Sequence, residues 1–368
     1  MRLGAMANLK EVPHHPSYSS SDSTPLFLVL IGRHVEWTRS LALFDELRPA
    51  IDAALTWMAT DGDSDGDGYL DYSGANENGL INQGWKDSGA GIPRHDGSTP
   101  EGPIALCEIQ GYAYLARKLI SRALDLRGEV AAAKDLDRDA EALRIRFNRD
   151  FWMEDEGCFA LALEAGGRQV TTVTSNAGQV LWAGIADPDK ADRNARRMMR
   201  LDMNSGWGIR TLSDREAAYN PLNYHLGSVW PFDTALIMVG MVDAGLSSSA
   251  VELFDAVIAA SSYFSLGRLP EFYVGHAREA DVSPSRCPFA EPMQAWSAGA
   301  APYMLSALLG LRSGTDGLEI VDPHLPGGVD RLHVRGLTIG TEGYHCEFIR
   351  NAEGAVSGRI VSRKEIDA

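Results

Sequence analysis

The sequence predicts a mainly α-helical fold in which paired helices are wound into a ring. From position 24 onward, apolar residues recur at helical spacing in blocks separated by Gly, Pro and Asp or Asn turns. The loops between these blocks are alternately short and long, and the long loops are rich in Trp, Gly and Asp. After Leu311 the pattern changes to short alternating segments, which predict a small β segment at the C-terminal end.

The helical blocks predict about nine helices. Their expected ranges are 24–30 extending toward 37, 40–60, 102–125, 128–147, 176–184, 188–201, 227–244, 247–262 and 292–311. A small hairpin is expected around the turn Glu164-Ala-Gly-Gly, from the pieces 158–163 and 169–172. The C-terminal strands are expected at 318–321, 330–339, 344–351 and 355–362.

Composition excludes several classes of partner. The chain has 368 residues and a formal net charge of −16, which would repel phosphate backbones and anionic lipid. We therefore expect no nucleic acid and no membrane as partner. The first residues lack the apolar region of a signal peptide, and no apolar run reaches the roughly 18 residues of a membrane span, so a cytoplasmic protein is expected. The four cysteines have no zinc-like spacing, and we expect no cofactor.

An acidic loop offers a weak metal candidate. Asp61, Asp63 and Asp65 alternate with other residues in a spacing that resembles a calcium-binding EF-hand loop. Gly66 stands at the required sixth position, but Tyr72 stands where a bidentate Glu is expected. An Asp- and Gly-rich turn is therefore the favoured interpretation, with calcium binding as the alternative.

Two acidic residues far apart in the sequence carry the strongest chemical signal. Asp87 lies in Asn-Gln-Gly-Trp-Lys-Asp-Ser (82–88), and Glu271 lies in Gly-Arg-Leu-Pro-Glu-Phe-Tyr-Val-Gly (267–275). Aromatic faces stack on sugar rings, amides bind hydroxyl groups, and two opposed carboxylates cleave glycosidic bonds. The pair therefore predicts an enzyme that acts on carbohydrate, with an oligo- or polysaccharide as its substrate.

Other polar and aromatic residues gather in the same segments. Glu108 and Gln110 lie within an apolar helical run, where they either line a pocket or brace neighbouring helix ends. Lys86 either points away or contacts the substrate or another carboxylate. The loops before two later helices combine aromatic, amide and charged side chains, which is typical of a sugar subsite. The further candidates for substrate binding are Gln83, Trp85, Trp207, Arg210, Tyr224, His225, Trp230, Asp233, Gln294 and Trp296.

These motifs closely resemble the glucosidase domain of bacterial amylo-α-1,6-glucosidase, one of the glycogen-debranching-enzyme-like glycoside hydrolases. That group belongs with the wider (α/α)6-toroid glucosidases. The similarity covers about residues 1–311 and rests on the runs G-L-I-N-Q-G-W-K-D-S, S-G-W-G-I-R-T-L-S, Y-N-P-L-N-Y-H-L-G-S-V-W-P, R-L-P-E and Q-A-W-S-A-G-A. It implies a toroid catalytic domain at 1–312 and a β appendage at 313–368.

The resemblance also implies the chemistry. Asp87 takes the general acid position and Glu271 the general base position of an inverting hydrolase of α-glucosidic linkages, with α-1,6 branches or short gluco-oligosaccharides as substrates. It places on the pocket lining Tyr18, Asp22, Trp85, Arg210, His225, Trp230, Asp233 and Trp296.

Several features depart from that family. Phe232 and Gln179 stand where the family has His, and Ala5 stands where an acidic residue is usual. A complete toroid needs twelve helices, so the ring is expected to be incomplete, as in an N-terminally truncated form or a divergent gene product. Its open helix faces predict low stability or oligomerisation. The alternatives are a non-catalytic carbohydrate-binding remnant and a glycosidase of the trehalase or mannosylglycerate-hydrolase type.

Overall fold

Helices dominate the protein, as the sequence predicts. The computed structural model describes residues 20–73 and 80–361. The described helices are α2 (Ser23–Thr38), α3 (Ala42–Glu46), α4 (Arg48–Ala59), α5 (Cys107–Arg127), α6 (Val130–Asp150), α7 (Ser175–Ala183), α8 (Pro188–Met198), α9 (Pro231–Asp243), α10 (Ser247–Ser261) and α11 (Ala295–Leu308), with a 3-10 turn, η1, at Ser265–Gly267. None of them is both long and apolar enough to cross a bilayer.

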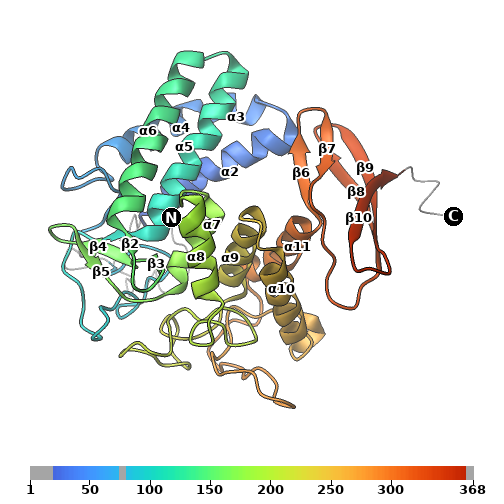
Figure 1. Cartoon of the computed structure of the whole chain (residues 1–368). Coiled ribbons are helices and arrows are strands. Elements are labelled where there is room, and N and C mark those ends of the chain that lie inside the picture. The colour runs from blue at the N-terminus through green and yellow to red at the C-terminus, as the bar shows by residue number, and fades with distance from the viewer. Residues whose placement is uncertain (1–19, 74–79, 362–368) are drawn as a thin grey trace, which may run out of the picture.

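The helices form a row of pairs (Figure 1). Helices α2, α5, α7, α9 and α11 pack against one another in succession, and α4, α6, α8 and α10 pack against α2, α5, α7 and α9 respectively. One continuous apolar core runs through this row. The long loops that follow α8 and α10 gather at one end of the helices, where they exchange backbone hydrogen bonds such as Val229 N to the Tyr273 carbonyl. This end of the row carries most of the predicted site residues.

The largest differences from the predicted ranges are the division of the segment 40–60 and the later starts of α9 and α5. The segment 40–60 is two helices because Pro49 lies in the first turn of α4 and cannot continue α3. Helix α9 begins at Pro231 instead of 227, because the preceding residues are extended and Val229 bridges both Arg210 and Tyr273. Helix α5 begins at Cys107, after Pro103 and a short strand.

Small antiparallel sheets connect the helices. Strand β1 (Ala105–Leu106) pairs with β4 (Ala162–Glu164), and β4 pairs with β5 (Arg168–Val170) in the hairpin that the sequence predicts. Strand β3 (Cys158–Phe159) pairs instead with β2 (Trp152–Met153), so the first predicted piece of the hairpin is divided between two sheets. The sheet with β1 leads directly into α5 and thereby fixes where that helix begins.

The C-terminal segment is a separate β structure that lies beside α2 and α11, the first and last described helices of the row (Figure 1). Its strands are β6 (Leu311–Gly314), β7 (Gly317–Ile320), β8 (Arg331–Ile339), β9 (Glu342–Arg350) and β10 (Val356–Val361). They have their own apolar cluster, against which Trp37 of α2 and Leu305 of α11 pack. The Ser313 hydroxyl donates to the Glu36 carbonyl, which ties β6 to the C-terminal turn of α2.

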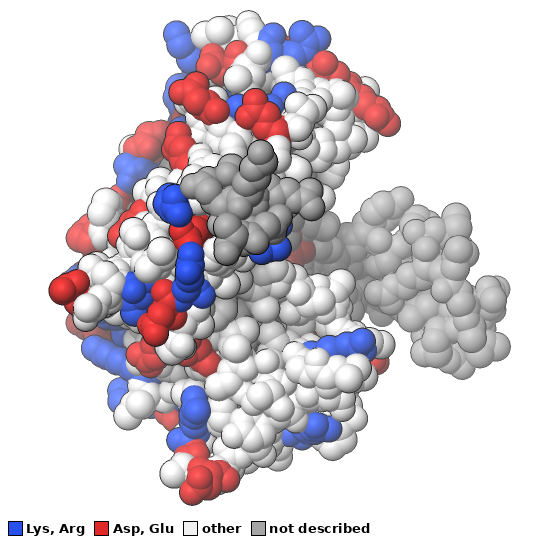
Figure 2. Space-filling view, turned by 90° about the vertical axis from the view of Figure 1, so that its right-hand side faces the viewer, with Lys and Arg blue, Asp and Glu red and all other residues white. Residues whose placement is uncertain are grey.

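Acidic side chains are dispersed over the described surface seen in Figure 2. On the face drawn in Figure 2, basic and acidic side chains are interspersed over the upper and left parts, whereas a broad area at the centre and lower right carries few charges. The negative net charge is therefore not concentrated in one patch on this face.

Gly240 should be one of the most sensitive positions in the helical row. A Cβ there would lie 2.4 Å from the Trp182 amide nitrogen and 2.5 Å from the Leu181 carbonyl carbon, both backbone atoms of α7. We expect Gly240→Ala to destabilise the protein by about 1–3 kcal/mol, because α7 and α9 must separate.

Gly299→Ala is the matched control, because a Cβ at this helical glycine meets nothing within 4 Å. It should be neutral or stabilising by about 0.5–1 kcal/mol. Urea unfolding measures both variants, and equal stability of the two would contradict the close approach of α7 and α9.

Candidate active site

The loop that carries Asp87 lies against a cluster of aromatic side chains. Trp85 contacts Phe232, Trp230 and His225 edge to face, with ring centroids 5.0, 5.7 and 5.4 Å apart. Within this loop Trp85 and Lys86 are buried, whereas Asp87 is exposed. The aromatic cluster therefore supports the loop from one side while the Asp87 carboxylate is presented to solvent.

Glu271 is held from both of its oxygens. The Tyr224 hydroxyl donates to Oε1 at 2.5 Å, and the backbone amide of Glu291 donates to Oε2 at 3.1 Å. The Glu271 amide in turn donates to the Glu291 carbonyl, so the loop after α10 is closed around the carboxylate. These hydrogen bonds fix the orientation of the carboxylate, as a general base requires.

The two predicted catalytic acids act on one hydroxyl group. Burial and the hydrogen bond to Glu271 raise the pKa of Tyr224, and the charges of Glu271, Asp87 and Glu291 raise it further. Asp87 also acts on Asp22, at the N-terminal end of α2: burial raises the pKa of Asp22, a hydrogen bond from Ser20 opposes this, and the charge of Asp87 adds to the rise. The charge of Asp87 thus reaches both Asp22 and the Tyr224–Glu271 pair.

His225 is neutral in this site. Burial and the positive charge of Lys86 lower the pKa of His225 to about 3. Its Nδ1 is 2.9 Å from the Ser88 hydroxyl, next to Asp87, while its Nε2 is buried without a hydrogen-bond partner among the described residues. The Trp85 Nε1 is likewise buried and has no partner within the described part of the chain. Both nitrogens therefore have hydrogen-bonding capacity that the described residues do not use.

A buried polar network includes Lys86 of the Asp87 loop. Asn176 donates to Glu108 at 2.8 Å, and the Lys86 ammonium donates to the Thr211 carbonyl at 2.6 Å. Burial raises the pKa of Glu108 to about 7, partly opposed by the bond from Asn176 and by Lys86. Burial also raises the pKa of Asp233, and the charge of Lys86 again opposes the rise. Glu108, Lys86 and Asp233 therefore form one interacting group.

The two positions that depart from the family's His are accommodated by neighbours. Gln179 donates to Asp233 at 2.5 Å and accepts a hydrogen bond from the Tyr112 hydroxyl. Phe232 stacks on Trp296, with parallel rings whose centroids lie 3.9 Å apart. Trp296 remains 38% exposed, so its aromatic neighbours do not cover it completely.

Several predicted binding residues are engaged elsewhere. The Gln110 amide makes hydrogen bonds to the backbone of Leu70 and Leu106. Gln110 therefore braces neighbouring segments, which is one of the two roles that the sequence predicts for it. The Arg210 guanidinium donates to the Gly275 and Leu201 carbonyls, because this cation is buried and needs acceptors within the fold.

The remaining predicted residues lie at the margin or outside the cluster. Trp207 belongs to a separate cluster, where Arg278 lies 4.1 Å from its ring centroid. Gln294 precedes α11 and lines a cavity of about 500 Å³ beside α10. The Gln83 carbonyl accepts the Ser21 amide, which joins the Asp87 loop to the N-terminal end of α2. Tyr18 and Ala5 lie outside the described residues.

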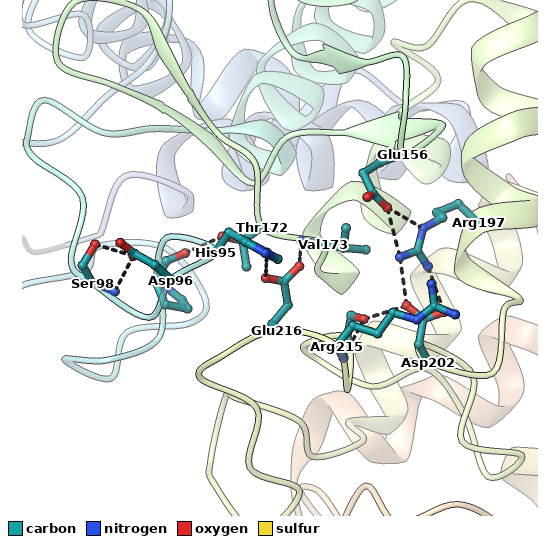
Figure 3. Close-up of polar contacts among 12 residues, drawn as sticks. His95, Asp96, Ser98, Glu156, Thr172, Val173, Arg197, Asp202, Arg215 and Glu216 are labelled. Atoms are coloured by element: carbon teal, nitrogen blue, oxygen red, sulfur yellow. Dashed lines mark hydrogen bonds and ion pairs between the residues drawn. The ribbon is translucent and has the colours of Figure 1, made fainter.

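A second polar network anchors the loop that follows α8 (Figure 3). Arg197 and Asp202 form a buried ion pair at 2.8 Å, to which the Ser213 hydroxyl adds a bond to Asp202 at 2.6 Å. Glu216 accepts the Val173 amide at 2.8 Å and lies 2.7 Å from His95 Nδ1. This network fixes both ends of the segment 202–216, which supplies the Thr211 carbonyl to Lys86.

The acidic loop forms the turn that the sequence favours. Asp63 accepts the amides of Gly66, Asp67 and Gly68, and Asp71 accepts the Ser64 amide. Carboxylate oxygens of Asp63, Asp65 and Asp71 lie within 4.8 Å of one another. Asp61 is outside this group, so the calcium prediction would need Asp71 in its place.

Sequence reasoning missed three contributors to the site. Asn176 and Ser88 contact Glu108 and His225, and Glu291 closes the loop on Glu271. A buried amide in the first turn of a helix, preceded by Thr and Ser, could have indicated Asn176. The other two depend on contacts between segments far apart in the sequence.

Comparison with known proteins identifies the class as a glycoside hydrolase domain. A model of the family described as "Mannosylglycerate hydrolase MGH1-like glycoside hydrolase domain" matches residues 9–268. The chain belongs to this family. The match supports the glycosidase prediction at the level of the class, while the amylo-α-1,6-glucosidase type remains a prediction. A comparison with curated proteins gives no match.

Solved structures resemble the chain to different degrees. A chain described as "Sialidase" shares the fold, with a TM-score of 0.68 at 15% identity, over 92% of this chain and 31% of that one. A GH63 mannosylglycerate hydrolase from Thermus thermophilus, in complex with Tris and D-glycerate, gives a TM-score of 0.46 at 17% identity, over 54% of this chain and 46% of that one. The chain thus spans less than half the length of either protein.

Proposed function

We propose that the protein is an inverting glycoside hydrolase that cleaves α-glucosidic linkages in short neutral oligosaccharides. The observation that supports the proposal is the Tyr224 hydroxyl, which donates a hydrogen bond to Glu271 and also feels the charge of Asp87. Two carboxylates that act on opposite sides of a bound sugar are what inversion requires.

In this mechanism Asp87 is the general acid and Glu271 the general base. Asp87 protonates the leaving oxygen. Glu271, oriented by the Tyr224 hydroxyl and the Glu291 amide, removes a proton from water, which attacks the anomeric carbon from the opposite face. A carboxyl separation of roughly 6.5–9.5 Å is expected, to leave room for that water.

The helical row supports the toroid part of this proposal. Among the described residues, five helices pack in succession and each of the first four packs against a second helix, an arrangement expected of part of an (α/α)6 toroid. The predicted acids lie in loops at one end of this row. We propose that the sugar binds there, in the region of the aromatic cluster.

The charge of the site favours a neutral sugar over an anionic one. The charges of Glu271, Asp87 and Glu291 act on Tyr224, and the charge of Asp87 also acts on Asp22, whereas the cation Lys86 is buried. Negative charges at close range would repel a carboxylate-bearing substrate. We therefore propose gluco-oligosaccharides, with α-1,6 branch stubs among them, as substrates. The second candidate is a mannosylglycerate-type glycoside, which the family match favours.

A substrate panel followed by proton NMR tests the proposal. Isomaltose and panose represent α-1,6 linkages, maltose and trehalose the other glucosides, and mannosylglycerate the second candidate. The expected result is hydrolysis of a neutral glucoside with the β-anomer released first. Release of the α-anomer would overturn the inverting mechanism, and preferential cleavage of mannosylglycerate would favour the second candidate. Sugar binding in calorimetry without release of reducing sugar would instead indicate a non-catalytic protein.

A further inference from the structure

Lys86 is buried, whereas the next residue, Asp87, is exposed. Its side chain is 1% exposed, and the adjacent Asp87 side chain faces solvent, so the two leave the loop on opposite sides. The ammonium donates to the Thr211 carbonyl at 2.6 Å and lies 5.1 Å from the Trp85 ring centroid. A buried ammonium is costly unless it is compensated, so its surroundings indicate its role.

The compensation comes from the first turns of two helices. Glu108 lies in the first turn of α5 and Asp233 in the first turn of α9, both are fully buried, and both act on the Lys86 charge. Each carboxylate is held by an amide of α7, Glu108 by Asn176 and Asp233 by Gln179. Residues of three neighbouring helices, α5, α7 and α9, are therefore linked in one network to a single side chain of the Asp87 loop.

This connection extends to the other side of Asp87. Ser88, the next residue, contacts His225 Nδ1 at 2.9 Å, and the charge of Lys86 contributes to keeping His225 neutral. The Asp87 loop is thus fixed before and after the catalytic position, by Lys86 toward the helices and by Ser88 toward the loop that also carries Tyr224.

We propose that Lys86 is a positioning residue that holds the loop 84–88 in the geometry in which Asp87 meets the substrate. This inference rests on the proposed function for the role of Asp87. The competing explanation is that Lys86 only neutralises Glu108 and Asp233, which a charge-balanced variant can separate from positioning.

The variants are Lys86→Met and the double variant Lys86→Met with Asp233→Asn. The single variant leaves two buried carboxylates without a cation, so it should be strongly destabilised. The double variant removes one cation and one anion and should recover most of the melting temperature. Because it still lacks the bond to Thr211, its kcat should remain about 100-fold low while KM changes less than about threefold, the cost expected of a misplaced catalytic group.

Hydrogen exchange gives a readout that needs no activity. In the double variant, the backbone amides of 84–88 should exchange at least about tenfold faster than in the wild type, because the loop has lost its attachment. Wild-type exchange, or wild-type kcat, in a double variant of recovered stability would overturn the inference. If the wild-type protein hydrolyses none of the panel yet exchange accelerates as expected, the proposed function fails and the positioning of the loop stands.

The pH profile supplies a second readout. Burial lowers the pKa of Lys86 to about 8, against the raising effects of Asp233, Glu108 and Cys107. His225 and Asp22 also face this network, through Lys86 and Glu108 respectively. Since the ammonium is lost as the pH rises through this value, wild-type kcat should fall above about pH 8. The double variant should lack this alkaline limb, and an unchanged limb would contradict the role of Lys86.

Discussion

Asp87→Asn and Glu271→Gln should each lower kcat by about 10²–10⁴-fold, the range that general acid and base catalysis contributes. Asn cannot protonate the leaving oxygen, and Gln cannot remove a proton from water. Both substitutions keep the shape of the side chain, and the amide oxygen introduced by Glu271→Gln would still accept the Tyr224 hydroxyl bond that holds this position. Steady-state kinetics on the substrate cleaved by the wild type, with circular dichroism to verify folding, measures the effect.

Asp155→Asn is the control for these variants. Asp155 is an exposed acid in the turn between β2 and β3, away from the site, and its substitution should leave kcat within about twofold of wild type, as expected of surface changes. Retention of near-full activity by either site variant would remove that residue from the mechanism. A loss in both site variants with normal sugar binding is the outcome that the two-carboxylate mechanism requires.

Arg197→Met should destabilise the protein by about 3–5 kcal/mol, because it leaves the Asp202 carboxylate buried without its cation. The two side chains are 3% and 2% exposed and 2.8 Å apart, and Asp202 also anchors the loop through Ser213 (Figure 3). Arg193→Met, on the same helix, is the matched control: its partner Glu154 is 72% exposed, and the loss should be within about 1 kcal/mol. Similar losses for the two variants in urea unfolding would contradict this ranking.

The effect of Arg197 should depend on pH in a defined direction. Although burial opposes it, the bonds from Ser213 and Arg197 hold the pKa of Asp202 below its usual 3.8. The contribution of the pair is therefore fully present above the unfolded value and is lost as the pH falls through the folded one. The stability difference between Arg197→Met and wild type should shrink when unfolding is measured at progressively acid pH.

The periodic part of the fold could be predicted from the sequence because it is local. Each described helix from α2 to α11 overlaps a range that the spacing of apolar residues predicts, and the division of 40–60 at Pro49 is also a local effect. The change of pattern after Leu311 likewise marks where β6 begins. The helical row itself, with α2 and α11 at its ends, is not visible in any single segment.

The site could be predicted only in part, because burial decides what a polar side chain does. Gln110 and Arg210 have the chemistry of sugar-binding residues, yet both are engaged by backbone groups that no pattern along the chain reveals. The position of Trp207 could not be predicted either, because it packs with Tyr273 and Val229, which lie in other segments of the chain. In contrast, sequence context indicates Lys86 and Asp233 individually, and only the fold shows that they belong to one network.

The tie between β6 and the first described helix has a consequence for synthesis of the protein. The Ser313–Glu36 bond joins residues 277 positions apart, and Trp37 packs on strands that are synthesised much later than α2. During synthesis, α2 would therefore leave the ribosome with an uncovered apolar surface until these strands emerge. Such long-range closure slows folding and exposes the nascent chain to aggregation, so we expect yield in cells to depend on chaperones and on growth temperature.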